Sequence, residues 1–145
     1  NLESLKQEKF IYEISDILRD FYYPEDEIFY IFHKTVETLR KECPWDRKQT
    51  KESLLKYFEE EFTELKEAIK KNDIDNTVEE LGDVLLEIML LIIIGEENNE
   101  FKVNDILNRV IEKLVKRHPH VFKDEIIKTA EEVEDRWEEL KKNSI

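Results

Sequence analysis

Apolar residues recur along this chain at the spacing of a helix face. Between residues 2 and 20, Leu5, Phe10, Ile14 and Leu18 follow one another at steps of four or five positions, close to the period of about 3.6 residues of an α-helix. Pro24 interrupts the pattern, because proline removes a backbone donor and clashes with the preceding turn. This part of the sequence therefore predicts a first helix.

Five more helices are predicted in the rest of the chain, separated by prolines and short polar stretches. Pro44 ends the second helix and Pro119 the fifth, because a helix interior does not tolerate proline. The start of the third can be capped by Asp46 with Gln49, or by Thr50. In order, we expect the helices to cover about 25–40, 50–71, 75–98, 103–117 and 129–142.

Two of these helices carry strongly apolar faces. Residues 85–94 of the fourth helix are apolar except for Glu87, which is typical of the buried central helix of a bundle. This run is too short to span a bilayer. The third helix has an expected core stripe of Leu54, Phe58, Phe62, Leu65 and Ile69.

The scarcity of structure breakers indicates the fold class. The chain has two glycines and three prolines in 145 residues, too few for the turns and loops of a sheet protein. The sequence therefore predicts an all-α fold, an antiparallel helix bundle that is completed by oligomerisation. Residues 26–145 form one domain in this interpretation. Residues 1–25 form a helical appendage or a linker, within what can be a longer multidomain chain.

Charge and cysteine content exclude several classes of partner. The formal net charge of −13 disfavours binding to nucleic acid or to an anionic membrane, since both need a basic face. A single nucleotide remains compatible with this charge, because a bound divalent metal inverts the local field. Cys43 is the sole cysteine, so an intrachain disulfide is excluded and a reducing cytoplasm is the expected compartment.

Acidic residues gather at helical spacing on the third and fourth helices. Glu61 and Glu64 are three residues apart, as are Glu80 and Asp83, and residues at this spacing project together from a helix. The short turn between the helices makes them antiparallel neighbours, so both pairs can face one groove. Burying these acids together is costly unless a cation compensates their charge. All donors are oxygens, which favours Mg²⁺, with Mn²⁺ as the alternative.

The same spacing has plainer explanations. In a chain with 36 acidic residues, a Glu-Glu-x-x-Glu sequence arises readily on a solvated helix face. Glu80 can also close a capping box with Thr77. Spacing alone therefore does not decide between a metal site and a solvated acidic face. The repetition of the acidic spacing on two adjacent helices is what favours a metal site.

Three segments follow one another along the chain. They are Cys43-Pro44-Trp45-Asp46-x-x-Gln49-Thr50, the acidic pair Glu60-Glu61-x-x-Glu64 and Glu80-x-x-Asp83, and Arg117-His118-Pro119-His120-Val121-Phe122. In this order they resemble the MazG-type nucleoside triphosphate pyrophosphohydrolases, over roughly residues 29 to 142. The resemblance implies Mg²⁺-dependent hydrolysis of nucleoside triphosphates between the α- and β-phosphates, in a homodimer or larger homo-oligomer, for clearing the nucleotide pool.

The resemblance also implies roles for single residues around the acids. Glu60 would orient or deprotonate the attacking water, or support the metal ligands. Lys113 and Arg117 would act on the phosphates, although both can instead pair with Glu112 or another acid. The implied metal ligands are Glu61, Glu64, Glu80 and Asp83.

The resemblance also implies two contacts with the nucleotide base near the end of the chain. Trp137 offers a stacking face, and Lys141 follows it by four residues, although Trp137 can instead pack the last helix onto the bundle. Upstream, Trp45 and Asp46 can line the pocket, or they can plug the bundle end and cap the third helix.

Other conspicuous residues have structural interpretations. His118 and His120 flank Pro119 after a helix, where they are expected to cap carbonyls or pack the turn. Cys43 has no base beside it in sequence, which argues against a nucleophilic role. Gly82 is interpreted as the residue that permits close helix approach beside the metal.

Two other classes of function compete with the hydrolase. One is a non-catalytic helical module that recognises a protein. The other is a di-iron carboxylate bundle, which requires Glu-x-x-His on two helices. Here the second positions, Glu64 and Asp83, are acids, which argues against a redox metal.

Overall fold

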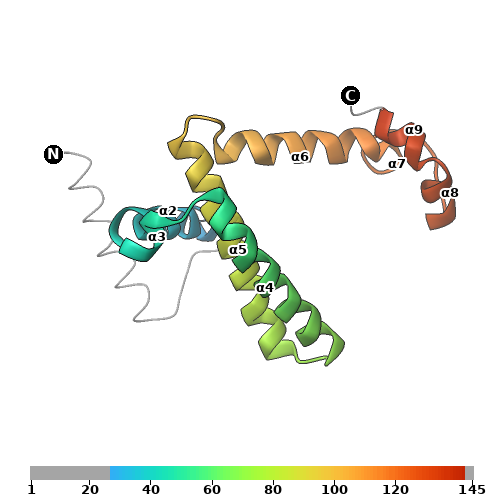
Figure 1. Ribbon diagram of the computed structural model, residues 1–145. Coiled ribbons are helices and arrows are strands. Elements are labelled where there is room, and N and C mark those ends of the chain that lie inside the picture. Colours follow the sequence, from blue (N-terminus) through green and yellow to red (C-terminus); the bar gives the residue numbers. More distant parts are fainter. Residues whose placement is uncertain (1–26, 143–145) are drawn as a thin grey trace. The chain divides into compact units, whose positions relative to one another are not determined.

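The computed structural model describes residues 27–142 (Figure 1). Within this range all regular structure is helical and no strand occurs, so the predicted all-α class is confirmed. The chain divides into two compact units, Asn1–Ile94 and Gly95–Ile145, which are described one at a time. The helix expected before Pro24, and the domain boundary expected after residue 25, lie outside the described residues.

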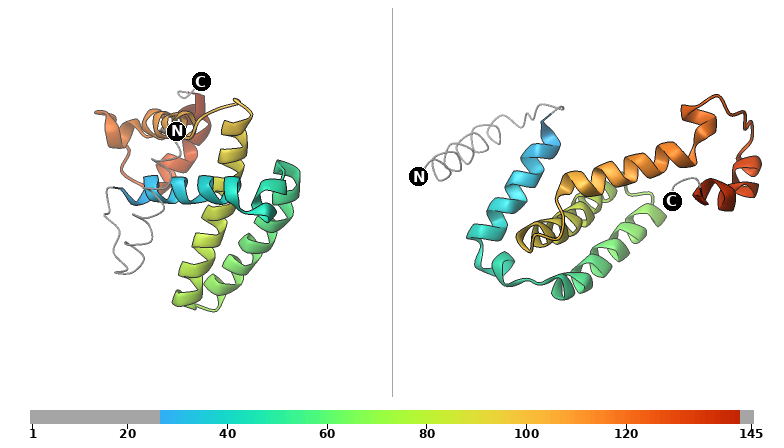
Figure 2. Two further views of the ribbon diagram at one scale, coloured as in Figure 1. Left: turned by 90° about the vertical axis from the view of Figure 1, so that its left-hand side faces the viewer. Right: turned by 90° about the horizontal axis from the view of Figure 1, so that it is seen from above.

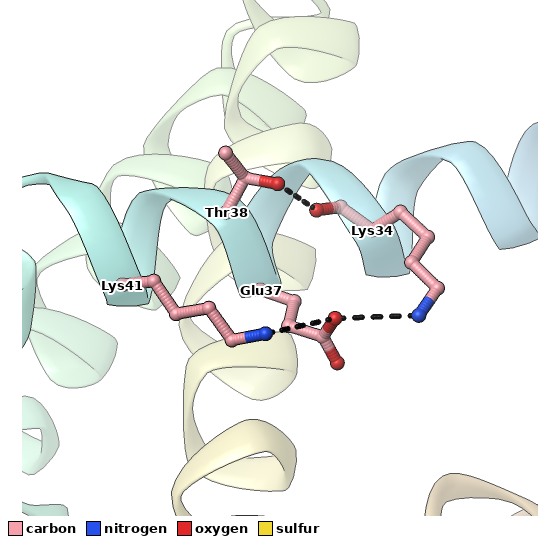
Figure 3. A network of polar contacts seen from close by, with 4 residues as sticks. All are labelled: Lys34, Glu37, Thr38 and Lys41. Carbon is pink, nitrogen blue, oxygen red and sulfur yellow. Dashed lines mark hydrogen bonds and ion pairs between the residues drawn. The ribbon is translucent and has the colours of Figure 1, made fainter. Parts of the chain in front are cut away.

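The first described helix of unit 1 is α2, Ile28–Glu42, which buries Ile31 and Val36 on one face. The exposed side of this helix is held by local polar contacts (Figure 3). The Glu37 carboxylate lies 3.3 Å from the Lys34 ammonium and 3.7 Å from that of Lys41. Such pairs, three and four residues apart, each stabilise a helix by a few tenths of a kcal/mol, about 0.2–0.5. The stability of α2 therefore rests mainly on its buried face.

A short helix that was not predicted, α3 (Pro44–Lys48), follows Cys43. Pro44 does end α2, but it also occupies the first position of α3, where its missing N–H costs nothing. The Arg40 guanidinium donates hydrogen bonds to the backbone carbonyls of three residues at the end of α3, namely Asp46, Arg47 and Gln49. Arg40 therefore ties the last turn of α2 to α3.

The long helix α4, Lys51–Lys70, starts with a capping box formed by Thr50 and Ser53. The Ser53 N–H donates to the Thr50 hydroxyl at 3.1 Å, and the Thr50 N–H donates to the Ser53 hydroxyl at 2.9 Å. The alternative with Asp46 is wrong, because Asp46 belongs to α3 and Gln49 donates to the Trp45 carbonyl.

Helices α4 and α5 (Ile74–Glu97) lie side by side as an antiparallel hairpin in both Figure 1 and Figure 2. The connecting turn uses Asn72 at a φ of 54°, a left-handed conformation that asparagine tolerates. Asp73 accepts a hydrogen bond from the Asn76 N–H. Thr77 donates to the Asp73 carbonyl from inside the first turn of α5, so the capping box of Thr77 with Glu80 does not form.

The core of unit 1 joins three helices. It contains Val36 from α2, Leu54 from α4, and Met89, Leu90, Ile93 and Ile94 from α5. The expected apolar run of α5 is thus a core segment in its second half. The stripe predicted for α4 is wrong at Phe62 and Ile69, which are 46% and 59% exposed.

Unit 2 contains α6, Val103–Arg117, as predicted. The four-residue helix α7 starts at Pro119, so Pro119 opens a helix as well as ending α6. The single helix expected at 129–142 is two helices, because Arg136 leaves helical geometry between them. Its guanidinium pairs with Glu125 and lies 3.5 Å from the Glu139 carboxylate. The new elements are α7 Pro119–Phe122, α8 Ala130–Asp135 and α9 Trp137–Lys142.

Among the described residues, none of the helices combines the length and the hydropathy that a bilayer crossing demands.

Candidate metal centre

The α4–α5 hairpin brings carboxylates from both helices together. One carboxylate oxygen from each of Glu61, Glu64 and Glu80 lies within 4.8 Å of the other two. Glu61 and Glu64 share a side of α4 because they are three residues apart, and Glu80 meets them from α5. The structure therefore assembles three of the four residues predicted as metal ligands.

The environment of Glu80 indicates that this cluster needs a positive charge. Its side chain is only 7% exposed, and its Oε2 is buried without a hydrogen-bond partner in the structure. Burial raises the pKa of Glu80, and the negative charges of Glu64, Asp83 and Glu61 raise it further. A hard divalent cation would satisfy the orphaned oxygen and the excess charge at once.

Glu61 has a similar environment. Burial raises its pKa above the ordinary value, as do the charges of Asp83, Glu64 and Glu87, and its hydrogen bond with Glu80 opposes this. Asp83 is half-buried, and its negative charge acts on Glu61, Glu80 and Glu87. Asp83 therefore borders the cluster although it is not one of the three carboxylates in mutual reach.

Glu60 lies at the solvent edge of this region. Its carboxylate is 3.9 Å from the Lys56 ammonium, and both side chains are exposed. An open hollow of about 400 Å³ is lined by Glu60 and Glu64, together with Lys56, Glu59 and Thr63. Glu60 therefore has room for a water molecule beside a predicted metal ligand.

Trp45 and Asp46, both on α3, differ in burial. Asp46 is buried, whereas Trp45 is 41% exposed and meets the edge of Tyr57 with ring centroids 5.4 Å apart. Trp45 therefore leaves a large apolar surface open rather than plugging the bundle end. The charge of Asp46 acts on Glu87 of α5, which places Asp46 on the acidic side of unit 1.

The structural role assigned to Gly82 is wrong. A Cβ atom added there would meet nothing within 4 Å. The close approach occurs at Gly95, where such an atom would lie 2.0 Å from the ring of Phe101. In unit 2, therefore, Gly95 is the glycine that packing requires.

The predicted phosphate and base contacts lie in unit 2. Trp137 has the Arg117 guanidinium carbon 5.9 Å and the Lys141 ammonium 5.9 Å from its ring centroid. Glu112 pairs with Lys116 at 2.6 Å, not with Lys113. Lys141 also lies 3.3 Å from the Glu138 carboxylate. Trp137 is thus flanked by two cations at cation–π distance.

The histidines behave as expected for a helix end. The Nδ1 of His118 lies 2.7 Å from the Leu114 carbonyl, and His118 follows the last residue of α6. Its ring is 6.2 Å from that of Trp137 and 5.5 Å from that of His120. Both histidines therefore pack the turn after α6. Cys43, in unit 1, is a free cysteine that directly precedes α3.

Two residues of these regions were not singled out from the sequence. Glu87 is buried on α5, and one of its carboxylate oxygens has no hydrogen-bond partner. Its position as the one acid within the apolar residues 85–94 could have identified it from the sequence. Arg109 shares a hollow of about 400 Å³ with Lys113 in unit 2. It precedes Lys113 by four residues, as Lys113 precedes Arg117, so helical spacing would have included it.

The fold and the acidic cluster together define an all-helical protein with an oxygen-donor site suited to a divalent cation. Residues 49–122 match the family model of the MazG nucleotide pyrophosphohydrolase domain. The chain belongs to this family, so the predicted resemblance is confirmed.

Relatives from several bacteria agree. The chain is 39% identical over 99 residues to a nucleoside triphosphate pyrophosphohydrolase of Escherichia coli, covering 68% of this chain and 38% of that protein. It is 50% identical over 82 residues to a nucleoside triphosphate pyrophosphohydrolase/pyrophosphatase MazG of Thermotoga maritima, covering 57% and 32%. The chain spans about a quarter to a half of the length of the curated relatives it matches best in these comparisons.

A solved structure supports the fold. The crystal structure of a mazG-related protein from Thermotoga maritima superposes with a TM-score of 0.68 at 34% sequence identity. The match covers 77% of this chain and 96% of that one. The helical arrangement is therefore shared with a member of the same family.

Proposed function

We propose that this chain hydrolyses nucleoside triphosphates between the α- and β-phosphates, releasing a monophosphate and pyrophosphate, with Mg²⁺ as cofactor. The observation that carries the proposal is the cluster of Glu61, Glu64 and Glu80, whose oxygens lie within 4.8 Å of one another. Membership of the MazG family supports the reaction. Removal of aberrant nucleotides from the pool is the physiological role that fits this chemistry.

The cation would be held by Glu61, Glu64 and Glu80, with Asp83 as the fourth ligand. The donor set contains carboxylate oxygens and no sulfur or imidazole nitrogen, the preference of Mg²⁺ and Mn²⁺. Once bound, such a cation supplies positive charge against phosphate oxygens and makes an attacking water more acidic.

The remaining roles fall to side chains of this chain. Glu60 accepts a proton from the attacking water at the open hollow that it shares with Glu64. Lys113 and Arg117 neutralise charge on the phosphates, Arg117 through its planar fork. Trp137 stacks on the base, Lys141 lies over the same ring, and Trp45 and Asp46 line the pocket from α3.

We also propose that the chain works as a homodimer or larger homo-oligomer in the cytoplasm. Exposed apolar residues on α5 repeat at alternating steps of four and three, a spacing typical of helices that pack against a partner helix. Cys43 as the sole cysteine suits a reducing compartment. The residues of this α5 stripe are Ile74, Val78, Leu81, Leu85 and Ile88.

The test is pyrophosphate release from a panel of nucleoside triphosphates with Mg²⁺. Glu64→Ala and Asp83→Ala are expected to abolish turnover while leaving the helical circular dichroism unchanged, because neither side chain belongs to the apolar core. Glu79→Ala, an exposed acid on α5, is the matched control and should retain activity.

Two results would contradict the proposal. Unchanged pyrophosphate release in either variant would remove the site assignment. Failure of Mg²⁺ to raise the melting temperature of the chain would indicate a module without a metal site, since a ligand that binds the folded state stabilises it by mass action.

A further inference from the structure

Helix α6 of unit 2 carries a basic residue that the proposed reaction does not use. Arg109 precedes Lys113 by four residues, as Lys113 precedes Arg117. Residues at this spacing are neighbours on a helix surface, so the three cations form one row along α6. Because a helix rises about 1.5 Å per residue, the row is about 12 Å long. Arg109 therefore extends the two proposed phosphate contacts by one position toward the start of the helix.

Arg109 and Lys113 line the same hollow of about 400 Å³. Two acids, Glu100 and Asp105, line it as well, and both come before Arg109 in the chain. Each already accepts a hydrogen bond from a neighbouring N–H group, at 3.1 Å for Glu100 and 2.8 Å for Asp105. A phosphate at Arg109 would be the last that the row accepts, because these acids repel any further negative charge.

The two cations of this hollow are not neutralised by a carboxylate of the protein. Lys116, on the same helix, pairs with Glu112 at 2.6 Å. Arg109 acts on Glu112 through its charge, but among residues 27–142 neither Arg109 nor Lys113 forms an ion pair through its side chain. In a chain with 36 acidic and 23 basic residues, two neighbouring cations in this condition are available to an anion from outside.

Trp137 marks the opposite end of the row. Its ring centroid lies 5.9 Å from the guanidinium carbon of Arg117, and its helix α9 lies near the end of α6 in Figure 1. Along α6 the order is therefore Trp137, Arg117, Lys113 and Arg109, with an aromatic face at one end and a cation at the other.

We propose that Arg109 binds the terminal phosphate of the nucleoside triphosphate, which lies along α6 with its base at Trp137. The planar fork of an arginine matches two phosphate oxygens at once. The inference rests on the proposed function, and it deepens that function by assigning the preference for triphosphates over diphosphates to one residue.

The experiment compares the binding of two probes by calorimetry with Mg²⁺. They are the α,β-methylene triphosphate and the α,β-methylene diphosphate of the nucleoside whose triphosphate the unmodified chain hydrolyses fastest, since a carbon bridge blocks cleavage between these phosphates. Arg109→Ala should weaken the triphosphate about tenfold or more and leave the diphosphate within about twofold. Lys113→Ala should weaken both probes. Lys116→Ala, the matched control, removes a cation of α6 that is already paired and should weaken neither.

The outcomes separate this inference from the proposed function. Equal weakening of the two probes by Arg109→Ala, or weakening of neither, overturns the assignment of the terminal phosphate and leaves the proposed reaction in place. Failure of the unmodified chain to release pyrophosphate from any nucleoside triphosphate overturns both. Arg109 is exposed, so the variant should fold, which circular dichroism establishes. Arg109→Gln, with the same expected result, decides the question if the alanine variant loses helicity.

Discussion

Single carboxylates dominate the chemistry of this molecule at the scale of residues. Glu61, Glu80 and Glu87 all have raised pKa values, and burial is the largest cause in each case. Without a cation these side chains work against the fold at neutral pH, because the folded state holds their protons more tightly than the unfolded chain. Glu61 and Glu80, which we assign to the metal site, and Glu87 beside them on α5 therefore lower the stability of the metal-free protein.

This gives a pH prediction for the metal-free chain. A carboxyl with a raised pKa in the folded state contributes stability below the unfolded value, about 4.3 for glutamate, and that contribution is lost as the pH rises through the folded pKa. We expect the melting temperature in EDTA to fall as the pH rises from about 5 to 8. Mg²⁺ should reverse most of this decline, since it favours the ionised carboxylates.

Two substitutions isolate the contribution of the buried acids from that of overall charge repulsion. Glu80→Gln should flatten the pH dependence in EDTA, because it removes a titrating group with a raised pKa. Glu112→Gln should not flatten it, because the pKa of Glu112 is lowered by its hydrogen bond with Lys116 and by the charge of Lys116. Equal effects of the two substitutions, measured by thermal unfolding, would contradict this account.

At the scale of elements, the junction of α2 and α3 depends on one side chain. Arg40→Ala would remove one donor from each of three carbonyls at the end of α3, and only that of Asp46 would keep another, the Gln49 N–H. The net contribution of a hydrogen bond to a charged group is about 1.5–3 kcal/mol, so we expect a decrease in the free energy of unfolding of at least about 2 kcal/mol. Arg47→Ala, an exposed arginine on α3, should change it by less than about 0.5 kcal/mol in urea unfolding.

The two glycines of α5 are expected to differ in the same measurement. Gly82→Ala places a Cβ atom in open space, and replacing glycine inside a helix by alanine gains about 0.5–1 kcal/mol. Gly95→Ala drives a Cβ atom into the ring of Phe101, so it should destabilise unit 2 as overpacking does, by about 1–3 kcal/mol. A loss of stability in Gly82→Ala would mean that another protein chain packs against this position.

The sequence predicted an element correctly where residues within that element determine its ends. Helix α6 begins and ends where apolar spacing and Pro119 predict, and the capping alternative that used Thr50 was correct. The short helices α3 and α7 were missed because prolines were interpreted as ends, although each also occupies the first position of a new helix. The exposure of Phe62 could not be foreseen, since helical spacing identifies an apolar face without identifying what covers it.

At the candidate site, too, spacing predicted contacts within one helix but not those between helices. Spacing placed Glu61 beside Glu64, and Glu80 beside Asp83, and the hairpin then brought Glu80 to the α4 pair. The burial of Glu87 depends on the packing of α5 in unit 1, which no local pattern encodes. Tertiary packing therefore buried an acid that helical spacing alone had not singled out.

At the scale of the whole molecule, unit 1 leaves apolar surface open on both helices of its hairpin. The α5 stripe repeats at steps of four and three, and α4 exposes Leu55, Phe62 and Ile69 at steps of seven. An interface of this kind needs apolar complementarity because the net charge of −13 otherwise keeps identical chains apart. Regular heptad spacing on neighbouring helices is what a second copy of the same hairpin would match.

The last prediction tests this surface directly. Val78→Glu combined with Leu85→Glu places two charges on the α5 stripe, at positions 65% and 54% exposed in the single chain, so the fold of the hairpin should survive while association is lost. Sedimentation velocity at micromolar concentration should show an oligomer for the unmodified chain and a monomer for the double variant. Ile126→Glu, at a position 76% exposed in unit 2, should remain oligomeric. An unmodified chain that sediments as a monomer would instead leave the α5 stripe open for a different protein, because apolar surface arranged at helical spacing is costly to keep in water.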